Sequence, residues 1–437
     1  MVTLAACGGG GPGVVPAAGV VANAGSAPSN PMLVNDTGGT QTTSGETARR
    51  ADNFVDSVGV NVHLGYYGTL YGDNFSAIQS LLVGLGIRHV RDGIYPGQTN
   101  LCTDFSQLAS HGIHSDFIVG QWMSPADVKT WDSCTARAAD AYEGLNEWDT
   151  SHPESDGNWP QTDRSVQQWL YSTVKSTRRV TVIAPSLTSE SAYAALGSVA
   201  ATSDVGNVHA YFAARNPGTP GWGDGNSFGV YGSLSYDLAI ARQPTGTKPM
   251  YITETGYGDT SDTVYVPPAT KARYVLRTLL EAWNAKVART YIYELVDEGG
   301  GYFGSYGLAD GTGSIKPAYA AVKNLLAHLS DPGTPVAPGS LSYTLAAPAQ
   351  VHHALFEKRD KSFVLALWLE ASEWDPNTNS PLALSPQTTR LTFGRIPSSL
   401  RTTSFDDAGN VTSGTVAPAG VVTLSIGESP TLLDVTP

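Results

Sequence analysis

Two glutamates each follow a short apolar run in a way that could bring their carboxyl groups together. Glu147 comes directly after Gly144-Leu145-Asn146, and Glu254 comes directly after Tyr251-Ile252-Thr253. Two carboxyl groups held about 5 Å apart can take different catalytic roles, one as a protonated acid and the other as an ionised nucleophile. The proximity of like charges itself raises one of the two pKa values and so separates these roles.

Polar residues near the ends of other apolar runs could support this pair. Arg91 stands at the end of the second run, and its guanidinium could keep Glu254 ionised through charge-assisted hydrogen bonds. Tyr211 could donate to Glu254 without adding charge, whereas Asn146 offers a neutral amide beside the other carboxyl group. His209 either contacts a bound molecule or is a hydrogen-bonded residue of the scaffold.

The elements that must position these residues alternate along the chain. Short β-rich runs are separated by segments with helical periodicity, which predicts parallel βαβ units, and eight strands close a barrel. The runs are Val58–Leu64, Ile87–Asp92, His114–Gln121, Ala141–Glu147, Arg179–Pro185, Asn207–Tyr211, Pro249–Glu254 and Arg289–Val296. We therefore expect an α/β fold, a (β/α)₈ TIM barrel over residues 51–330, with its reactive groups at the carboxyl ends of the strands.

The pattern changes after Leu329. A linker rich in proline and glycine is followed by short β runs without helices, which predicts a small antiparallel β-sandwich over residues 331–437. Trp368 and Trp374 do not form an aromatic row. We therefore expect the sandwich to pack on the barrel in a structural role.

The residues at the run ends resemble the active-site pattern of clan A glycoside hydrolases, the (β/α)₈ group that includes families 5 and 39. The resemblance covers residues 57–330 and rests on Asn146-Glu147, Glu254, Arg91 and the pair His209 and Tyr211. It implies retaining hydrolysis of a β-linked polysaccharide or oligosaccharide, with Glu147 as acid/base and Glu254 as nucleophile and without a cofactor.

The chain departs from the clan pattern at two places. Trp148 follows Glu147 where a proline is common, and the eighth run carries Tyr291, Tyr293 and Glu294 where the clan often places a tryptophan under the sugar. These departures leave the chemistry intact and the sugar specificity open.

Other residues at strand ends and in loops are candidate sugar contacts. His63 ends the first run and Trp122 follows the third. Trp148, Trp159 and Trp222 in strand-to-helix loops could extend the site over several sugar units, which favours cleavage within a chain.

Acidic residues cluster after the eighth run. Glu294, Asp297 and Glu298 could form a calcium site or a solvated acidic rim. Because the histidine and cysteine spacing of metal sites is absent, we expect no required metal.

Two alternatives to hydrolysis remain open at this point. The same site could serve a transglycosylase that remodels surface glycans, in which a sugar hydroxyl in place of water resolves the intermediate. The chain could also be a glycan-binding lipoprotein without catalysis, although a binder has no need for paired carboxylates.

Composition limits the partners of the chain. The 437 residues are 41% hydrophobic and 15% charged, with a formal net charge of -13. Such an acidic chain repels nucleic acid and anionic lipid, so we expect a neutral carbohydrate partner and a monomer. No apolar run approaches the roughly 20 residues that span a bilayer.

The cysteines bear on localisation. Leu4-Ala5-Ala6-Cys7 resembles a bacterial lipobox, and residues 8–50 are poor in large apolar side chains, which predicts a disordered tether. We therefore expect a secreted or cell-envelope protein with a possible lipid anchor at Cys7. Cys102 and Cys134 are either a disulfide or two buried thiols.

Overall fold

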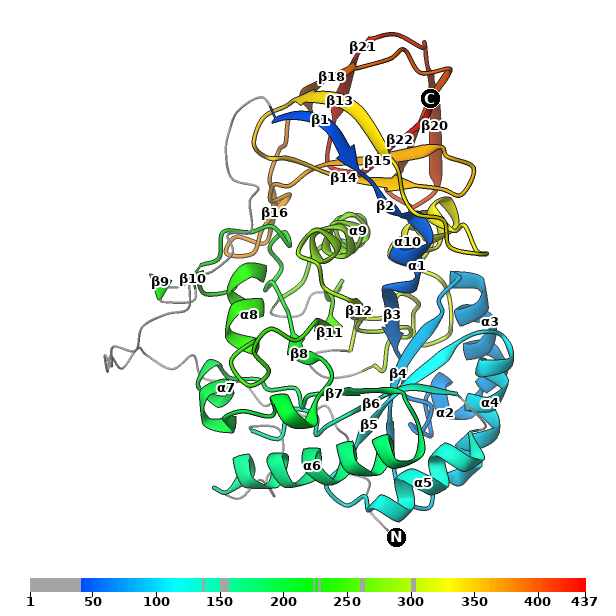
Figure 1. The fold of residues 1–437 in the computed structure, drawn as a ribbon, viewed down its shortest axis with the longest axis vertical. Helices are drawn as coiled ribbons and strands as arrows, with labels where there is room; N and C mark the ends of the chain where they lie inside the picture. The colour runs from blue at the N-terminus through cyan, green and yellow to red at the C-terminus, as the bar shows by residue number, and fades with distance from the viewer. Residues whose placement is uncertain are drawn as a thin grey trace.

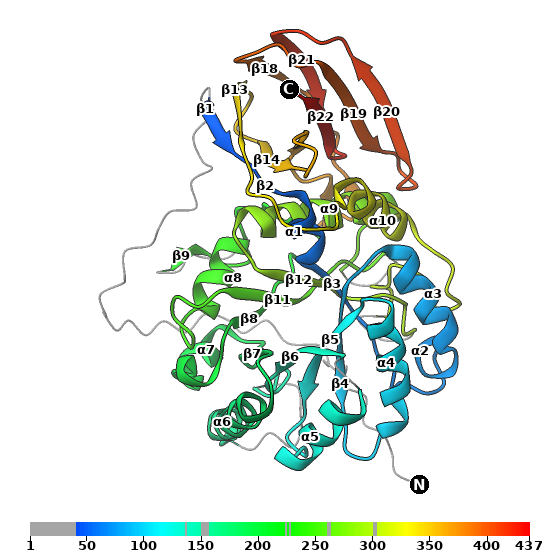
Figure 2. The ribbon, with the colours of Figure 1, turned by 45° about the vertical axis from the view of Figure 1, so that its right-hand side comes forward.

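The protein folds into a barrel with a β-sandwich beside it (Figures 1 and 2). The computed structural model describes residues 41–135, 138–149, 157–222, 225–226, 229–259, 264–299 and 304–437. The predicted Cys7 anchor and the tether over residues 8–40 lie outside these residues.

The barrel is an 8-stranded parallel sheet in the order β7-β6-β5-β4-β3-β12-β11-β8. A parallel bridge between Ile183 and Val205 links its two outer strands. The strands are β3 (Val58–Asn61), β4 (His89–Ile94), β5 (His114–Val119), β6 (Ala139–Glu143), β7 (Thr181–Ile183), β8 (Gly206–His209), β11 (Met250–Thr255) and β12 (Arg289–Ile292). Each predicted run overlaps one strand, with ends that differ by a few residues, so the prediction of a (β/α)₈ barrel is confirmed.

Packing inside the barrel explains why strand β3 carries a glycine between two valines. Val58 and Val60 of β3 are buried, and a Cβ atom on Gly59 would lie 2.3 Å from the ring of Tyr291. Only glycine therefore leaves room for the tyrosine of the neighbouring strand β12.

Helices cover the outside of the barrel, and their ends follow ordinary capping rules. Asn74 accepts a hydrogen bond from Ala77 N at the start of α3, and Gly86 ends this helix in the left-handed conformation. The helices are α1 (Ala51–Asp56), α2 (Leu70–Asp73), α3 (Phe75–Leu85), α4 (Cys102–Ser110), α5 (Pro125–Cys134), α6 (Trp159–Thr177), α7 (Glu190–Leu196), α8 (Leu234–Ala241), α9 (Pro268–Asn284) and α10 (Pro317–Leu329). Short 3₁₀ turns lie at Thr99–Leu101 and Ala200–Thr202, and β9 (Gly225–Asn226) pairs with β10 (Gly229–Val230).

The sandwich consists of two layers that are antiparallel, as predicted, except for one parallel pair between Arg49–Arg50 and the strand Val351–Glu357. One sheet has the order β1-β13-β18-β21 and the other β2-β14-β15-β22-β19-β20, while β16 (Trp374–Asp375) pairs separately with β17 (Ser380–Pro381). The C-terminal strands are β13 (Ser340–Ala346), β14 (Val351–Glu357), β15 (Phe363–Leu369), β18 (Gln387–Phe393), β19 (Ser399–Phe405), β20 (Val411–Val416), β21 (Val421–Ile426) and β22 (Thr431–Thr436).

The prediction of disorder was wrong for residues 41–50. They form β1 (Gln41–Thr47), which pairs with β13, and β2 (Arg49–Arg50), which pairs with β14. A strand at the edge of a sheet is held mainly by backbone hydrogen bonds, so this segment folds without an apolar face of its own. The sandwich is therefore built from both ends of the described chain.

The sandwich packs on α9 of the barrel, as expected. Arg49 donates to the carbonyl of Trp283 at 2.6 Å, and its guanidinium lies 3.2 Å from the ring centroid of this tryptophan. Trp368 donates to Glu281 at 2.7 Å and is fully buried. The two domains are thus joined by a packed interface and by the chain itself.

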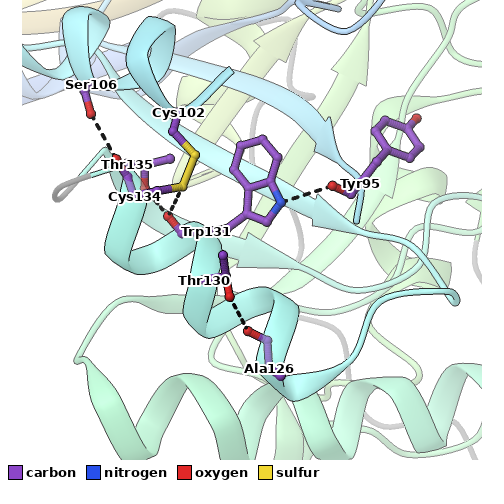
Figure 3. Close-up of a disulfide and its surroundings, with 8 residues drawn as sticks. All are labelled: Tyr95, Cys102, Ser106, Ala126, Thr130, Trp131, Cys134 and Thr135. Atoms are coloured by element: carbon purple, nitrogen blue, oxygen red, sulfur yellow. Dashed lines mark hydrogen bonds between the residues drawn. A yellow bond between two sulfur atoms is a disulfide. The ribbon is translucent and has the colours of Figure 1, made fainter. Parts of the chain in front are cut away.

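Cys102 and Cys134 form a disulfide, which decides between the two alternatives that the sequence left open. Their Cα atoms are 5.4 Å apart, and the bond joins α4 to α5 (Figure 3). Next to it, Trp131 donates from its indole nitrogen to the carbonyl of Tyr95 at 3.2 Å.

Over the part of the chain that the structure describes, no helix has the length and apolarity needed to cross a membrane.

Candidate active site

The carboxyl ends of the barrel strands surround a cavity of about 720 Å³. Glu147, in the loop after β6, and Glu254, in β11, both line this cavity. One oxygen of each carboxyl group and a nitrogen of His209 all lie within 4.8 Å of one another. The two glutamates that were picked out on their spacing therefore meet at one site.

Glu147 has a backbone conformation that is unfavourable for a residue with a side chain. Its φ is +49°, in the left-handed region, which costs a non-glycine residue about 1–2 kcal/mol. Its backbone N–H donates to the carbonyl of Ser186 at 3.0 Å, and Asn146 forms a parallel bridge with Ser186. Strain of this kind is retained where the surrounding structure enforces it, and it concentrates at functional sites.

Glu254 is held by two donors, as the sequence predicted. Arg91 Nη1 donates to one carboxylate oxygen at 2.7 Å, and the Tyr211 hydroxyl donates to the other at 3.0 Å. Arg91 is buried, which opposes its charge, but Glu143 and Glu254 outweigh this effect and raise the pKa of Arg91 well above its usual value. The guanidinium therefore stays charged next to Glu254.

Arg91 also binds residues that the sequence reasoning missed. Its Nε and Nη2 donate to the two carboxylate oxygens of Glu143 at 2.7 and 2.8 Å, and Nη1 donates to Asn61 at 2.9 Å. Glu143 is fully buried inside strand β6. A buried acid within an apolar run was the signal that could have identified it, because such a charge needs a partner.

Asn146 lies between the two charged groups. Its Oδ1 accepts from Arg91 Nη2 at 2.6 Å and from Ser186 Oγ at 3.1 Å. These two donors set the orientation of the amide, so that its N–H groups remain for a partner in the cavity, which Asn146 lines.

The hydrogen bonds around His209 indicate which ring nitrogen carries a proton. Arg91 Nη2 lies 3.5 Å from His209 Nε2, but its two protons go to Glu143 and Asn146 at 2.8 and 2.6 Å. Thr253 donates its hydroxyl proton to Asn207 Oδ1 at 2.6 Å, so its oxygen accepts from His209 Nε2, which lies 3.1 Å away. The other nitrogen, Nδ1, lies 2.6 Å from Glu147 Oε1 and 3.5 Å from Glu254 Oε2. A single proton between His209 Nδ1 and Glu147 therefore links the two side chains.

The pKa of His209 is raised by its acidic neighbours. Burial opposes the imidazolium form, but the negative charges of Glu254 and Glu147 outweigh burial. The sequence allows two roles for His209, and its contacts with both glutamates place it in the site.

His63 lines the cavity, and Glu298 and Glu294 lie beside it; Glu294, which the sequence predicted as a sugar contact, is fully buried. His63 Nε2 is 3.0 Å from Glu298 Oε1 and 3.5 Å from Glu294 Oε2, and Tyr71 donates to Glu294 at 3.1 Å. Burial lowers the pKa of His63 to about 4 and raises that of Glu298 to about 6. The nitrogen of His63 and the carboxylate oxygens of Glu294 and Glu298 lie close enough together to hold a divalent cation.

Asp297 belongs to a different contact from the one expected. Its carboxylate is 2.6 Å from Lys316 Nζ, and it also accepts from Gly307 N at 2.8 Å. It therefore braces the loop after β12 and does not join Glu294 and Glu298.

The predicted tryptophans lie in three kinds of place. Trp122 and Trp222 line the cavity with 42% and 37% of their surfaces exposed, and Trp122 is stacked on Tyr95 at 5.6 Å. Trp148 borders the cavity but is only 3% exposed, so it shapes the wall and offers no open platform. Trp159 packs partly buried against the core at the start of α6.

Comparison with known proteins shows the fold. No protein-family model and no curated protein matches the sequence. A family 39 glycoside hydrolase from Bacteroides cellulosilyticus superimposes with a TM-score of 0.59 and 16% identity, covering 89% of this chain and 81% of its own.

Two further solved structures agree in fold. The family 51 α-L-arabinofuranosidase of Thermotoga petrophila superimposes with a TM-score of 0.54 and 10% identity, covering 90% of this chain and 98% of its own. The α-L-arabinofuranosidase of Thermotoga maritima does so with a TM-score of 0.55 and 10% identity, covering 91% and 99%. Barrel and sandwich are thus shared together.

Proposed function

Starting from the fold of clan A glycoside hydrolases, we propose that this protein hydrolyses a β-linked polysaccharide or oligosaccharide with retention of configuration. Glu147 is the acid/base and Glu254 the nucleophile. The observation that carries the proposal is the approach of the two carboxyl groups, with oxygens within 4.8 Å of each other in a cavity at the barrel mouth. Retaining enzymes need carboxyl groups about 5–5.5 Å apart, whereas inverting enzymes leave room for a water at about 6.5–9.5 Å.

The two glutamates have neighbours that fit different roles. Glu254 accepts from the charged Arg91 and from Tyr211, and these two donors hold and orient its carboxyl group for attack. Glu147 shares a proton with His209, which suits a group that must release a proton in one step and take one up in the next.

The reaction then follows from these positions. Glu147 donates its proton to the leaving glycosidic oxygen while Glu254 attacks the anomeric carbon, so that the leaving bond breaks as the bond to Glu254 forms. The Glu147 carboxylate next takes a proton from water, whose oxygen displaces Glu254 and regenerates both groups. The amide of Asn146, whose Oδ1 is held by Arg91 and Ser186, can donate to a sugar hydroxyl, a contact that strengthens in the transition state.

Azide rescue tests the two roles separately. With a dinitrophenyl β-glycoside, which needs no acid for departure of its leaving group, Glu147→Ala should still form the intermediate, and azide should convert it to the β-glycosyl azide. Glu254→Ala should lose turnover by several orders of magnitude, and azide should give the α-azide because it attacks directly. The same anomer from both variants would refute the assignment.

The sugar is found by a screen of the purified protein against a panel of polysaccharides with product analysis, which also separates hydrolysis from transfer.

We further propose that the protein works outside the cytoplasm, secreted or anchored to the cell envelope through Cys7. The disulfide between Cys102 and Cys134 supports an oxidising compartment. Mass spectrometry of native membranes would show whether Cys7 carries lipid.

A further inference from the structure

A glutamate of the sandwich reaches into the loop that follows barrel strand β8. Glu370, directly after β15, accepts at Oε1 from Asn216 Nδ2 at 2.7 Å and from Gly218 N at 2.9 Å. Its side chain is only 1% exposed. Figure 1 shows this side of the sandwich, with β16, above α8 and the β9–β10 pair. The contact therefore crosses the boundary between the two domains.

The loop that Glu370 holds joins two parts of the cavity. Tyr211, the partner of Glu254, lies at its start, and Trp222, which lines the cavity, lies at its end. Between them Ala213 and Ala214 have φ values of 47° and 62°, a conformation that residues with side chains rarely adopt. Such a loop keeps its shape only when contacts outside it enforce that shape.

The fit around Glu370 is close. A Cβ atom on Gly218 would lie 2.2 Å from Glu370 Cγ, so the loop backbone lies against the glutamate side chain. Arg215 continues the contact to the cavity, because its guanidinium lies 4.4 Å from the ring centroid of Trp222. Tyr257 donates to the Arg215 carbonyl at 3.0 Å and fixes the other side of the turn.

We propose that Glu370 is a positioning residue through which the sandwich sets the place of Trp222, and that Trp222 contacts a sugar unit away from the bond that is cleaved. The protein would then select chains of several sugars over single glycosides. This inference rests on the proposed glycosidase function, whose site it extends. It gives the sandwich a role in substrate choice in addition to the structural role expected from the sequence.

The loop contact is tested first without substrate. Hydrogen exchange of residues 212–222 should become faster in Glu370→Ala than in the wild type, because the buried acceptor of Asn216 and Gly218 is lost. Glu281→Gln is the matched control, since Glu281 lies in the same interface but binds Trp368 and His352. Unchanged exchange in Glu370→Ala, or equal acceleration in the control, would show that Glu370 does not hold the loop. This outcome does not depend on whether the protein is a glycosidase.

Kinetics then test the role in selection. For the polysaccharide found in the screen, Glu370→Ala and Trp222→Ala should each raise KM about tenfold, and the double variant should be no worse than either. With the dinitrophenyl monoglycoside, Glu370→Ala should keep kcat/KM within about twofold, because this substrate is too short to need the sugar contact at Trp222. Equal losses on both substrates, or additive effects in the double variant, would refute the proposal.

A more conservative variant covers the case in which Glu370→Ala fails to fold. Glu370→Gln keeps the acceptor oxygen for Asn216 and Gly218, so it should retain slow exchange and a near-normal KM for the polysaccharide. If it instead behaves like Trp222→Ala while exchange stays slow, the loop contact is not what positions the tryptophan.

Discussion

Breaking the disulfide between Cys102 and Cys134 should destabilise the barrel while leaving the cavity unchanged. The bond links positions that are 32 residues apart. A closed loop of this length removes about 12–13 cal/mol/K of entropy from the unfolded chain, which corresponds to about 3.7 kcal/mol at 25 °C. A loss of this size is a large part of the stability of an ordinary domain.

Urea unfolding gives the measurement. The wild type with and without dithiothreitol should differ in unfolding free energy by about 3–4 kcal/mol. Cys102→Ala with Cys134→Ala should lose somewhat more, because Cys102 is 5% exposed and its removal leaves a small cavity. Cys7→Ala keeps the bridge and controls for the loss of a cysteine.

Activity should be nearly unaffected at 25 °C. Trp131 donates to the carbonyl of Tyr95 (Figure 3), and Tyr95 stacks on Trp122. These contacts hold the cavity wall without a bond to the sulfur atoms. A difference below about 1 kcal/mol between oxidised and reduced protein would refute the entropic reasoning.

Two further predictions concern the site. Tyr211→Phe removes one donor to Glu254 and should lower kcat/KM for an aryl glycoside about 10- to 100-fold; an unchanged value would mean that this bond does not stabilise the nucleophile. His63→Gln should flatten the pH dependence of stability. The pKa of His63 is about 4 when folded and 6.5 when free, so on acidification the unfolded chain takes the proton first and wild-type stability falls between pH 6.5 and 4. Urea unfolding should show the unfolding free energies of the two proteins diverging by up to about 3 kcal/mol in that window. Parallel curves would contradict the lowered pKa of His63.

The barrel was predictable because its strands are apolar runs closed by polar residues. Glu147, Glu254, Arg91 and Tyr211 could be identified since each stands where a parallel strand reaches the barrel mouth. In a parallel barrel the carboxyl ends of all strands lie at the same face, so a place at the end of a run already predicts a place at the barrel mouth.

Contacts between distant elements were not predictable in the same way. Nothing near Glu370 or Asn216 indicates that they meet, because the contact depends on how two domains dock. The strand β1 was missed for a similar reason, as its polar residues gain order only from hydrogen bonds with β13.

The left-handed backbone at Glu147 has a consequence for selection. Glycine adopts a φ of +49° without the penalty of about 1–2 kcal/mol that a side chain incurs, but it loses about 0.5–1 kcal/mol more chain entropy on folding. Glu147→Gly should therefore gain about 1 kcal/mol while it abolishes proton donation. A library of variants that is selected only for thermal stability would enrich this substitution and therefore contain many inactive proteins. Among diverged copies of this chain, glycine at position 147 would therefore mark a protein that has exchanged its proton donor for stability.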